Sequence, residues 1–428
     1  MSTTAVYRRS IRRAKVELEE FIQLISSSAS LNMKACAVKY IRMQCCLPAP
    51  RSLDRLIKGL IRCLSINYEN IQRDAAWALT NYACYPHDIC VKIIVHGGIA
   101  ALAKCARVTR GETRDMAIWA IGNIAADCNF CRRKVLYKNF FLFPVCWSTA
   151  LPTLLDIMNE DNFIYQQCAP NLLWSLSEIF RGGIPLLEPE VLFAILACLN
   201  EVLSTDNQLF KTYAALCVSY IAHDRFDGSQ VDVLLSVHGL LEKMVELFDE
   251  QVTSMSALTT VGHVVAGNDI QAQRALDLDI LPKIVKLFNS NTLNARRRRV
   301  IGWILSNIAA GTEAQVDLLF ETQGTIEMIH KLSTAEERPV RWEACWTVSN
   351  AFLRASQRRI FRICIPLLPV LAFALDEVKE GALCENILRA VEELIQKHAN
   401  FVYLIHVCGV LDRILSLLKT QPNADIEV

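Results

Sequence analysis

The sequence lacks the features that mark several broad classes of protein. Its 428 residues carry a formal net charge of +1, so there is no global field of the kind that a nucleic-acid binder usually shows. The N-terminal stretch MSTTAVYRRSIRRAK has no apolar segment behind its basic residues and is not a secretory signal. The longest apolar run, 363–375, is too short to span a bilayer and contains Pro366 and Pro369. We expect a soluble protein with no membrane insertion and no direct nucleic-acid binding.

Catalytic motifs are missing as well. The sequence has no phosphate-binding Gly-rich loop, no GxSxG and no HExxH, and its eight histidines show no ligand spacing. We expect a protein that is not an enzyme and needs no cofactor.

Cysteine, in contrast, is plentiful. The seventeen cysteines are scattered through apolar stretches, and without an export signal they are interpreted as small buried hydrophobes in a reducing compartment. The one spacing typical of a metal site is Cys128-Asn-Phe-Cys131, but the second such pair of a zinc site is absent. Packed thiols are therefore favoured over a metal, and a metal protein or enzyme built around Cys128 and Cys131 is kept as an alternative.

What the sequence does have is a repeated helical motif in a chain rich enough in apolar residues, at 52%, to build a large core. The motif is Trp-x-x-x-Asn. Positions i and i+4 lie on the same face of a helix, so each copy of the motif presents an indole beside a carboxamide. A further copy keeps Trp174 but has Glu178 in place of the asparagine. The Trp-x-x-x-Asn pairs are Trp77 and Asn81, Trp119 and Asn123, Trp303 and Asn307, and Trp346 and Asn350.

The motif recurs with a period near 43 residues. Successive positions are separated by 42, 55, 42, 43, 44, 43 and 43 residues, and the long interval holds an insertion at 138–150. These aligned positions are Trp77, Trp119, Trp174, Leu216, Thr259, Trp303, Trp346 and Arg389. A glycine or aspartate follows many of them by 20 to 23 residues, as a helix stop before a turn. The stops are Gly98, Gly239, Asp279, Gly324 and Gly409.

This period predicts an all-α fold of about nine three-helix repeats, stacked as an armadillo or HEAT solenoid. An armadillo array is a right-handed superhelix with an extended concave surface. We expect a basic N-terminal segment at 1–14, an armadillo-repeat domain at 15–420 and a polar tail at 421–428.

The third-helix segments AAWALTNYA, WAIGNIAAD, LLWSLSEIFRG, ILSNIAAGTEAQ and EACWTVSNAF resemble those of the importin-α family, over about residues 67–420. Members of that family are adaptors that bind Lys/Arg-rich nuclear localisation signals of cargo proteins. The resemblance implies a nuclear-import adaptor that shuttles between cytoplasm and nucleus, with an importin-β carrier and an export receptor as partners. A ladder of asparagines would hold an extended peptide by its backbone, while slots between indoles would take Lys or Arg stems.

Two clusters of residues match the family's peptide-binding sites. Asp127 matches the acidic residue that holds the key lysine of the signal. The major site comprises Trp77, Asn81, Trp119, Asn123, Asp127, Asn171 and Trp174. The minor site comprises Tyr220, Asp269, Trp303, Asn307, Glu343, Trp346 and Asn350.

The N-terminal segment offers a candidate contact with importin-β. It is either a much reduced version of the family's Arg-rich binding region or a basic start to the first helix, and both alternatives stay open. Its basic residues are Arg8, Arg9, Arg12, Arg13 and Lys15.

The sequence also departs from the family pattern. The run Arg296–Arg299 would repel a basic peptide if it faced the minor site, and we favour a convex or edge location. From the resemblance we expect the family's last repeat to be missing at the C-terminal end, which puts export-receptor binding in question. Another armadillo scaffold, for adhesion, signalling or anchoring, is the alternative function. Substituted positions are Glu178, Leu216 and His263 in the ladder, and Tyr85 and Cys90, where the family has glycine and threonine in the deepest lysine pocket.

Overall fold

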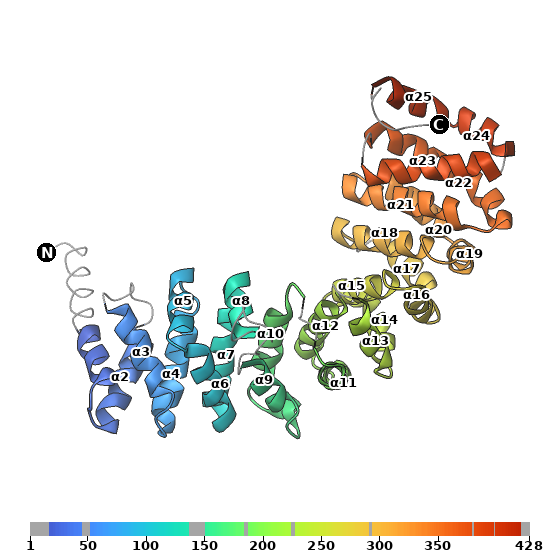
Figure 1. The fold of residues 1–428 in the computed structure, drawn as a ribbon. Helices are drawn as coiled ribbons and strands as arrows, with labels where there is room; N and C mark the ends of the chain where they lie inside the picture. The colour runs from blue at the N-terminus through green and yellow to red at the C-terminus, as the bar shows by residue number, and fades with distance from the viewer. Residues whose placement is uncertain are drawn as a thin grey trace. The chain divides into compact units, whose positions relative to one another are not determined.

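The structure is a computed structural model, and its regular elements are helices throughout the part of the chain that it describes (Figure 1). The chain divides into two compact units. Unit 1 comprises Met1–Ile184 and Glu201–Cys217, and unit 2 comprises Pro185–Asn200 and Val218–Val428. The described residues are 17–44, 52–136, 150–183, 187–223, 227–290, 293–378, 381–397 and 399–420.

Unit 1 is a stack of short helices that begins with a helical segment at 17–26. The helices α11 (Pro189–Leu203) and α12 (Gln208–Ala222) contribute residues to both units. Its other elements are α2 (Leu31–Met43), α3 (Leu53–Cys63), α4 (Glu69–Tyr82), α5 (His87–Val95), α6 (Gly98–Val108), α7 (Gly111–Asp127), α8 (Asn129–Leu136), α9 (Ala150–Met158), η1 (Phe163–Tyr165) and α10 (Ala169–Phe180).

Unit 2 continues the same pattern of helices separated by tight turns. Its elements are α13 (Ser229–Ser236), α14 (Leu240–Glu246), η2 (Leu247–Asp249), α15 (Ser254–Val265), α16 (Asp269–Leu276), α17 (Ile280–Asn289), α18 (Ala295–Ala309), α19 (Glu313–Glu321), α20 (Thr325–Ser333), α21 (Arg338–Arg354), α22 (Gln357–Glu377), α23 (Ala382–Lys397), η3 (Ala399–Phe401), α24 (Val402–Val407) and α25 (Val410–Thr420).

The expected helix stops lie in left-handed turns, with one correction. Gly239, Gly324 and Gly409 have φ values of 77°, 92° and 74°, and Asp279 has 54°. In the first such turn the left-handed residue is Gly97 (φ 80°), whereas the sequence placed the stop at Gly98. Gly98 begins α6, where a Cβ would lie 2.4 Å from the Ile93 side chain, so glycine is required there for close approach.

Several repeats have the expected three helices, and two others depart from that plan. Helix triplets are clear in α5 to α7, α8 to α10, α13 to α15, α16 to α18 and α19 to α21. In contrast, α11 and α22 each run on as one long helix before the helix that carries the ladder position. Neither contains a glycine that would end it, and α22 continues through Pro366 and Pro369. The helix therefore continues where other repeats turn.

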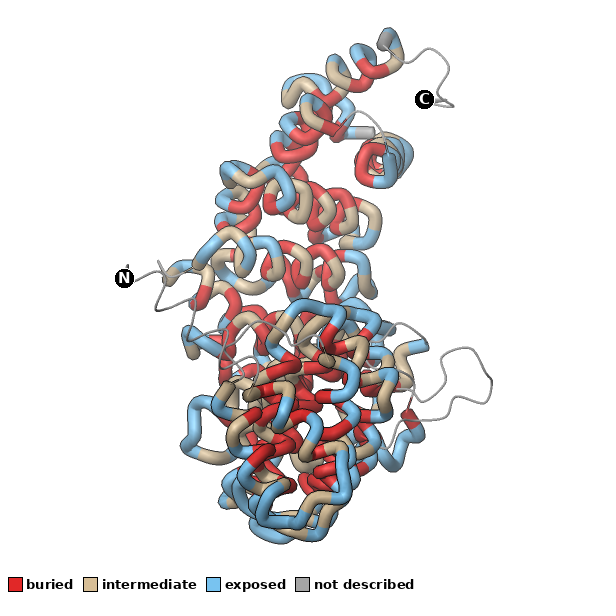
Figure 2. Tube along the Cα trace, turned by 90° about the vertical axis from the view of Figure 1, so that its left-hand side faces the viewer, coloured by how far each residue is buried: buried red, intermediate tan, exposed pale blue. Residues whose placement is uncertain are grey.

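The ladder helices pack against one another in chain order. Within unit 1, α4 contacts α7 and α7 contacts α10; within unit 2, α15, α18, α21 and α23 follow one another in the same way. Buried residues, red in Figure 2, are mostly aliphatic side chains along the lines where helices meet. Most of the described cysteines are buried among them. No single helix of the described residues is long and apolar enough to cross a membrane, although α5 and α6, bent by 73°, pass that test as a pair.

Candidate functional site

The first ladder is the set of tryptophans and asparagines that unit 1 presents on α4, α7 and α10. Its members are Trp77, Asn81, Trp119, Asn123, Asn171 and Trp174. All six are partly exposed, and Trp119 reaches 37% exposure. A large aromatic side chain that only filled the core would be covered, so these indoles leave part of their surface open to solvent.

At seven of the eight ladder positions the residue three places later is small, and where it is glycine it lets the tryptophan of the next repeat come close; the exception is Glu392, after Arg389. A Cβ on Gly122 would lie 2.5 Å from the Trp174 ring, and a Cβ on Gly262 would lie 2.3 Å from the Trp303 ring. The indole of one repeat thus lies on the backbone of the preceding one. The sequence analysis missed this position, although the signal is regular: it holds Thr80, Gly122, Ser177, Ser219, Gly262, Ser306 and Ser349.

Hydrogen bonds between repeats fix several asparagine side chains. The Asn123 amide donates to the Thr80 carbonyl at 3.0 Å, and in unit 2 the Asn350 amide donates to the Ser306 carbonyl, also at 3.0 Å. Asn386 then donates to the Asn350 side-chain oxygen at 2.8 Å. The carboxamides of Asn123 and Asn350 are therefore each held in one orientation by the neighbouring repeat.

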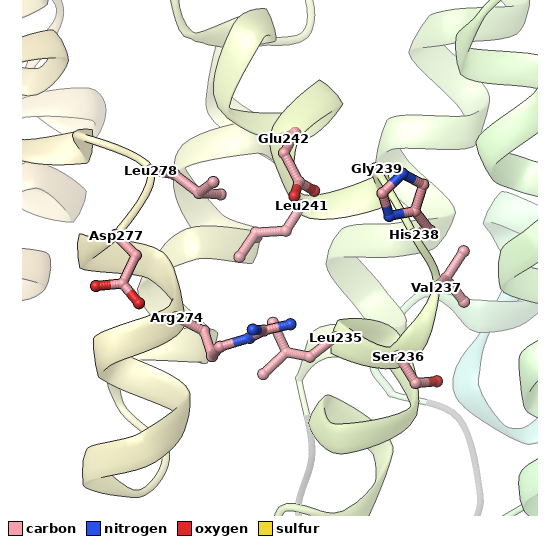
Figure 3. A pocket seen from close by; sticks show the side chains of 10 residues that line it. All are labelled: Leu235, Ser236, Val237, His238, Gly239, Leu241, Glu242, Arg274, Asp277 and Leu278. Carbon is pink, nitrogen blue, oxygen red and sulfur yellow. The ribbon is translucent and has the colours of Figure 1, made fainter.

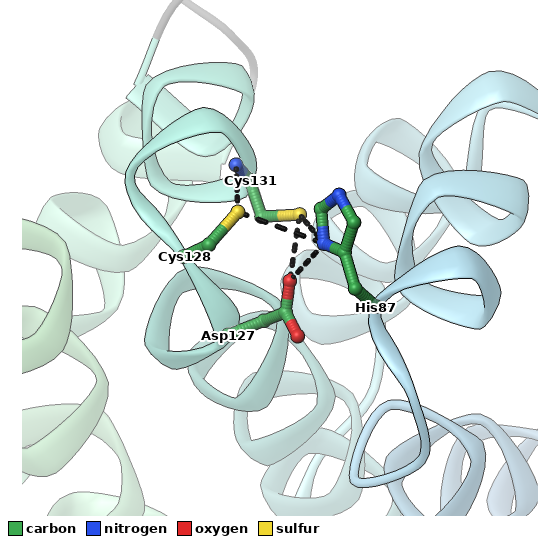
Figure 4. A group of neighbouring side chains, drawn as sticks. All are labelled: His87, Asp127, Cys128 and Cys131. Carbon is green, nitrogen blue, oxygen red and sulfur yellow. Dashed lines mark hydrogen bonds and ion pairs between the residues drawn. The ribbon is translucent and has the colours of Figure 1, made fainter.

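Asp127 ends α7 one helical turn after Asn123 and is already paired within the chain. His87 Nδ1 donates to its Oδ2 at 2.6 Å, and the Cys131 thiol donates to the same oxygen at 3.2 Å (Figure 4). The Asp127 side chain is only 15% exposed, whereas that of His87 is 54% exposed. Burial alone would raise the pKa of Asp127, but the hydrogen bonds from His87 and the two cysteines outweigh it and hold that pKa below its usual range.

Two further residues of the first ladder, Trp77 and Asn171, contact charged side chains of the chain itself. The Arg42 guanidinium is 4.2 Å from the centre of the Trp77 ring, and its Nε is 3.2 Å from Asp74. The Asn171 amide donates to Asp115 at 2.7 Å. Burial raises the pKa of Asp115, and the bond from Asn171 only partly offsets that effect.

The second ladder is the corresponding set in unit 2, formed by Trp303, Asn307, Trp346 and Asn350 on α18 and α21. These residues are likewise partly exposed. His263 occupies an asparagine position on α15, 3.0 Å from a His223 ring nitrogen and edge-on to Trp303 at 5.1 Å between ring centres. Burial, with a smaller contribution from His223, lowers the pKa of His263 to about 4.

Glu343, the predicted acidic residue beside Trp346, is paired with Arg299. The Arg299 Nε is 3.6 Å from Glu343, whose side chain is 14% exposed. Arg299 thus approaches a residue of the predicted minor site, and its cation stabilises the charged form of that largely buried carboxylate. Burial still raises the pKa of Glu343 despite that cation.

Other predicted residues have simpler surroundings. Asp269 is exposed in the first turn of α16, and Tyr220 is half-buried on α12. Cys90 is a packed thiol that donates to the Ala83 carbonyl at 3.2 Å, and burial raises its pKa to about 12. Glu178 is paired with Arg181 at 3.1 Å. Residues 1–14 and Lys15, the insertion as far as residue 149, and the tail at 421–428 lie outside the described residues.

A separate pocket of about 270 Å³ lies in unit 2 near the turn between α13 and α14 (Figure 3). Leu241 and Leu278 form its apolar part, and Arg274, Asp277 and Glu242 add charges. None of its lining residues belongs to the second ladder. This pocket therefore does not take part in the ladder site.

Comparisons with known proteins show an armadillo repeat in this chain and sequence similarity to importin α subunits. Residues 55–84 match the Armadillo/beta-catenin-like repeat. Importin subunit alpha-1b of rice is 30% identical over 227 residues, 53% of this chain and 40% of that protein. Importin subunit alpha-1a of rice is 29% identical over 272 residues, which are 63% of this chain and 48% of that protein. The matched region thus spans half or less of the length of these two relatives.

Two further matches cover more of the chain. Importin subunit alpha-8 of Arabidopsis thaliana is 26% identical over 371 residues, 84% of this chain and 78% of that protein. The crystal structure of an engineered protein superposes with a TM-score of 0.77 over 96% of this chain and 95% of the other, at 19% sequence identity. The fold is therefore an all-α armadillo-repeat solenoid, and the chain is similar in sequence to importin α subunits, with no catalytic family indicated.

Proposed function

We propose that the chain is a nuclear-import adaptor whose first ladder binds extended Lys/Arg-rich segments of cargo proteins. The observation that carries the proposal is the arrangement on α7: a 37% exposed Trp119, Asn123 one turn later and the carboxylate of Asp127 one turn after that. The neighbouring helices α4 and α10 repeat the indole beside it. The importin α subunits among the relatives support the same function.

The indoles would bind the side chains of the ligand. A Lys or Arg stem between two indoles buries its methylene groups, and its cation lies over the rings, at about 0.5–2 kcal/mol for each contact. Arg42 over Trp77, at 4.2 Å, already shows this geometry within the chain. A peptide cation would take the place of Arg42 or extend the row beyond it.

The asparagines would bind the backbone of the ligand. An extended peptide advances about 3.3 Å per residue, and packed helices are about 8–10 Å apart, so one rung meets the peptide every two or three residues. In Asn123 the amide group donates within the chain, to the Thr80 carbonyl and the Cys84 sulfur. Its oxygen would then accept a peptide N–H, which holds the backbone whatever the side chains are.

Asp127 would hold one lysine of the ligand. The lysine ammonium would replace His87, whose side chain is 54% exposed, in a charge-assisted hydrogen bond to Oδ2. In the second ladder the predicted acid, Glu343, is paired with Arg299, whose guanidinium would repel a basic ligand. We therefore expect the first ladder to be the stronger site for basic peptides.

The remaining parts of the adaptor function belong to the same proposal. An importin-β carrier would engage the basic residues Arg8, Arg9, Arg12, Arg13 and Lys15, and an export receptor would return the chain to the cytoplasm. Such a protein would move between cytoplasm and nucleus with its cargo.

The experiment is a fluorescence anisotropy titration of a labelled Lys-rich localisation peptide. The variants are the Trp77→Ala plus Trp119→Ala double mutant and the Trp303→Ala plus Trp346→Ala double mutant. We expect the first to lose more than tenfold in affinity and the second to lose less, with binding by the intact chain weakening as salt rises. Tyr165→Ala is the matched control, because Tyr165 is an 81% exposed aromatic residue of unit 1 outside the ladder.

The pairing of Glu343 with Arg299 favours a second candidate, an armadillo scaffold that binds extended peptides that are not basic. If the Lys-rich peptide does not bind, while a neutral or acidic extended peptide does and needs the tryptophans, the scaffold function replaces the import function.

A further inference from the structure

Four side chains with metal-binding atoms converge at the end of the first ladder. Asp127 is the last residue of α7, Cys128 follows it directly, Cys131 lies in the first turn of α8, and His87 begins α5. Their ligand atoms all lie within 4.8 Å of one another (Figure 4). We call these residues the Cys/His/Asp cluster.

The distances in the cluster suit a single tetrahedral ion. Zinc bonds of about 2.3 Å to sulfur and about 2.0–2.1 Å to nitrogen or oxygen place the ligand atoms roughly 3.3–3.8 Å apart. His87 Nδ1 is 3.6 Å from Cys128 Sγ and 3.8 Å from Cys131 Sγ, and Cys131 Sγ is 3.2 Å from Asp127 Oδ2. The 2.6 Å contact between His87 and Asp127 must open by less than about 1 Å, and the 3.2 Å contact between Cys131 and Asp127 by a few tenths of an ångström.

The surroundings of the cluster are those of a supported metal site. The Cys131 backbone N–H points to Cys128 Sγ at 3.4 Å, a contact that stabilises a thiolate. Arg132, the next residue, ties α8 to α10 by a hydrogen bond from its Nε to the Glu178 carbonyl at 2.8 Å. Cys131 is buried, while the His87 side chain is 54% exposed, so the cluster reaches from the core to the surface.

We propose that the Cys/His/Asp cluster binds one Zn²⁺ through Cys128 Sγ, Cys131 Sγ, His87 Nδ1 and Asp127. Two thiolates, one imidazole and one carboxylate are all ligands that zinc accepts, and a soft sulfur pair disfavours magnesium and calcium. On binding, each thiol releases its proton to solvent, the proton on His87 Nδ1 is lost and the ring keeps its proton on Nε2, and Asp127 exchanges the hydrogen bonds from His87 and Cys131 for the metal.

The site has a consequence for peptide binding, and this consequence rests on the proposed function. Asp127 is also the carboxylate that would hold a lysine of the cargo signal. Bound zinc would occupy that carboxylate, and a Lys-rich peptide would then bind several-fold more weakly in the presence of zinc than after a chelator is added.

The test uses the full chain and zinc alone. Zinc is titrated in competition with a chromophoric chelator, and Co²⁺ is then added to metal-free protein to record its absorption spectrum. We expect one zinc per chain, together with the intense visible bands and sulfur-to-metal charge transfer of tetrahedral cobalt with two thiolates. Cys128→Ser and Cys131→Ser should each weaken zinc binding by more than tenfold, and His87→Ala should weaken it as well.

Cys36→Ser is the matched control, because Cys36 is an exposed thiol outside the cluster. Circular dichroism establishes whether each variant is folded. If Cys131→Ser does not fold, the zinc affinities of Cys128→Ser and His87→Ala test the proposal. The proposal is overturned if the intact chain binds no zinc at one per chain, or if Cys128→Ser and His87→Ala bind zinc as tightly as the intact chain does. Because the peptide is absent, either result is independent of the proposed function.

Discussion

In the first ladder the carboxylate that ends α7 is paired with a histidine, whereas in the second ladder Glu343 is paired with an arginine. Both ladders share the partly exposed indoles, the carboxamides one turn later and the small residue between them. His87 Nδ1 forms a 2.6 Å hydrogen bond to Asp127, whereas the Arg299 Nε lies 3.6 Å from Glu343. The same scaffold thus pairs one carboxylate with an imidazole and the other with a guanidinium, and we expect the guanidinium to compete more strongly with a basic ligand.

The largest expected effect is a difference between Asp127 and Glu343 in how much peptide affinity is lost when each is substituted. Asp127→Asn is expected to weaken binding of a Lys-rich peptide by about 10- to 100-fold, because a hydrogen bond to a charged group contributes about 1.5–3 kcal/mol. Glu343→Gln should change the affinity less than about threefold, since Arg299 already occupies that carboxylate. Anisotropy titrations measure both, and equal losses would remove the distinction between the ladders.

The small residue that precedes the asparagine position should contribute equally to the stability of both units. Gly122→Ala and Gly262→Ala are each expected to lower the free energy of unfolding by about 1–3 kcal/mol, because the new Cβ meets an indole at 2.5 Å or 2.3 Å. This cost should outweigh the gain of up to about 1 kcal/mol in helix propensity.

Chemical denaturation measures these changes. Ser306→Ala is the control, since it changes the same position of another rung without adding bulk, and should lie within about 0.5 kcal/mol of the intact chain. If both glycine variants were as stable as this control, the close packing of rungs would play no part in stability.

The second ladder should lose stability in mild acid. The pKa of His263 is about 4 in the folded chain and about 6.5 when unfolded, so between these values the unfolded state binds the extra proton. Stability is therefore complete above pH 6.5 and falls as the pH drops towards 4, by about 1–2 kcal/mol at pH 5.

Denaturation of the intact chain and of His263→Asn at pH 7 and pH 5 checks this contribution. The variant keeps the carboxamide of the other rungs and cannot titrate, so its loss on acidification should be smaller. An identical loss in both proteins would assign the acid sensitivity to other groups.

The smallest expected effect concerns Arg299. In an Asp127→Asn background, where the first ladder is weakened, Arg299→Ala should raise the affinity for a Lys-rich peptide by about 3- to 10-fold, because Glu343 loses its internal cation. Arg296→Ala is the control, because Arg296 takes part in none of the salt bridges recorded for the described residues. The result is again measured by anisotropy, and equal affinities for both variants would count against the role of Arg299.

Much of this arrangement was predictable from the sequence. A period near 43 residues and the i, i+4 rule place Trp119 beside Asn123, because helical geometry is local. The partners of the carboxylates were not predictable, since His87 is 40 residues from Asp127 and reaches it only through the packing of α5 on α7 and α8. The same packing converts an isolated Cys128-x-x-Cys131 pair, interpreted from sequence as packed thiols, into a four-residue cluster.

Helix lengths were predictable only where a turn residue marks them. Gly239 and Gly324 end helices at the expected places. The stretch that forms α22 has no glycine to end it, and there one helix replaces the expected two.

A double-mutant cycle between Asp127→Asn and each lysine of a localisation peptide, changed to alanine one at a time, tests most directly whether Asp127 holds a lysine. We predict a coupling energy of about 1.5–3 kcal/mol for one lysine and less than about 0.5 kcal/mol for the others. Coupling near zero at every lysine, with the peptide still bound, would contradict the assignment of Asp127 as the carboxylate that selects a basic ligand.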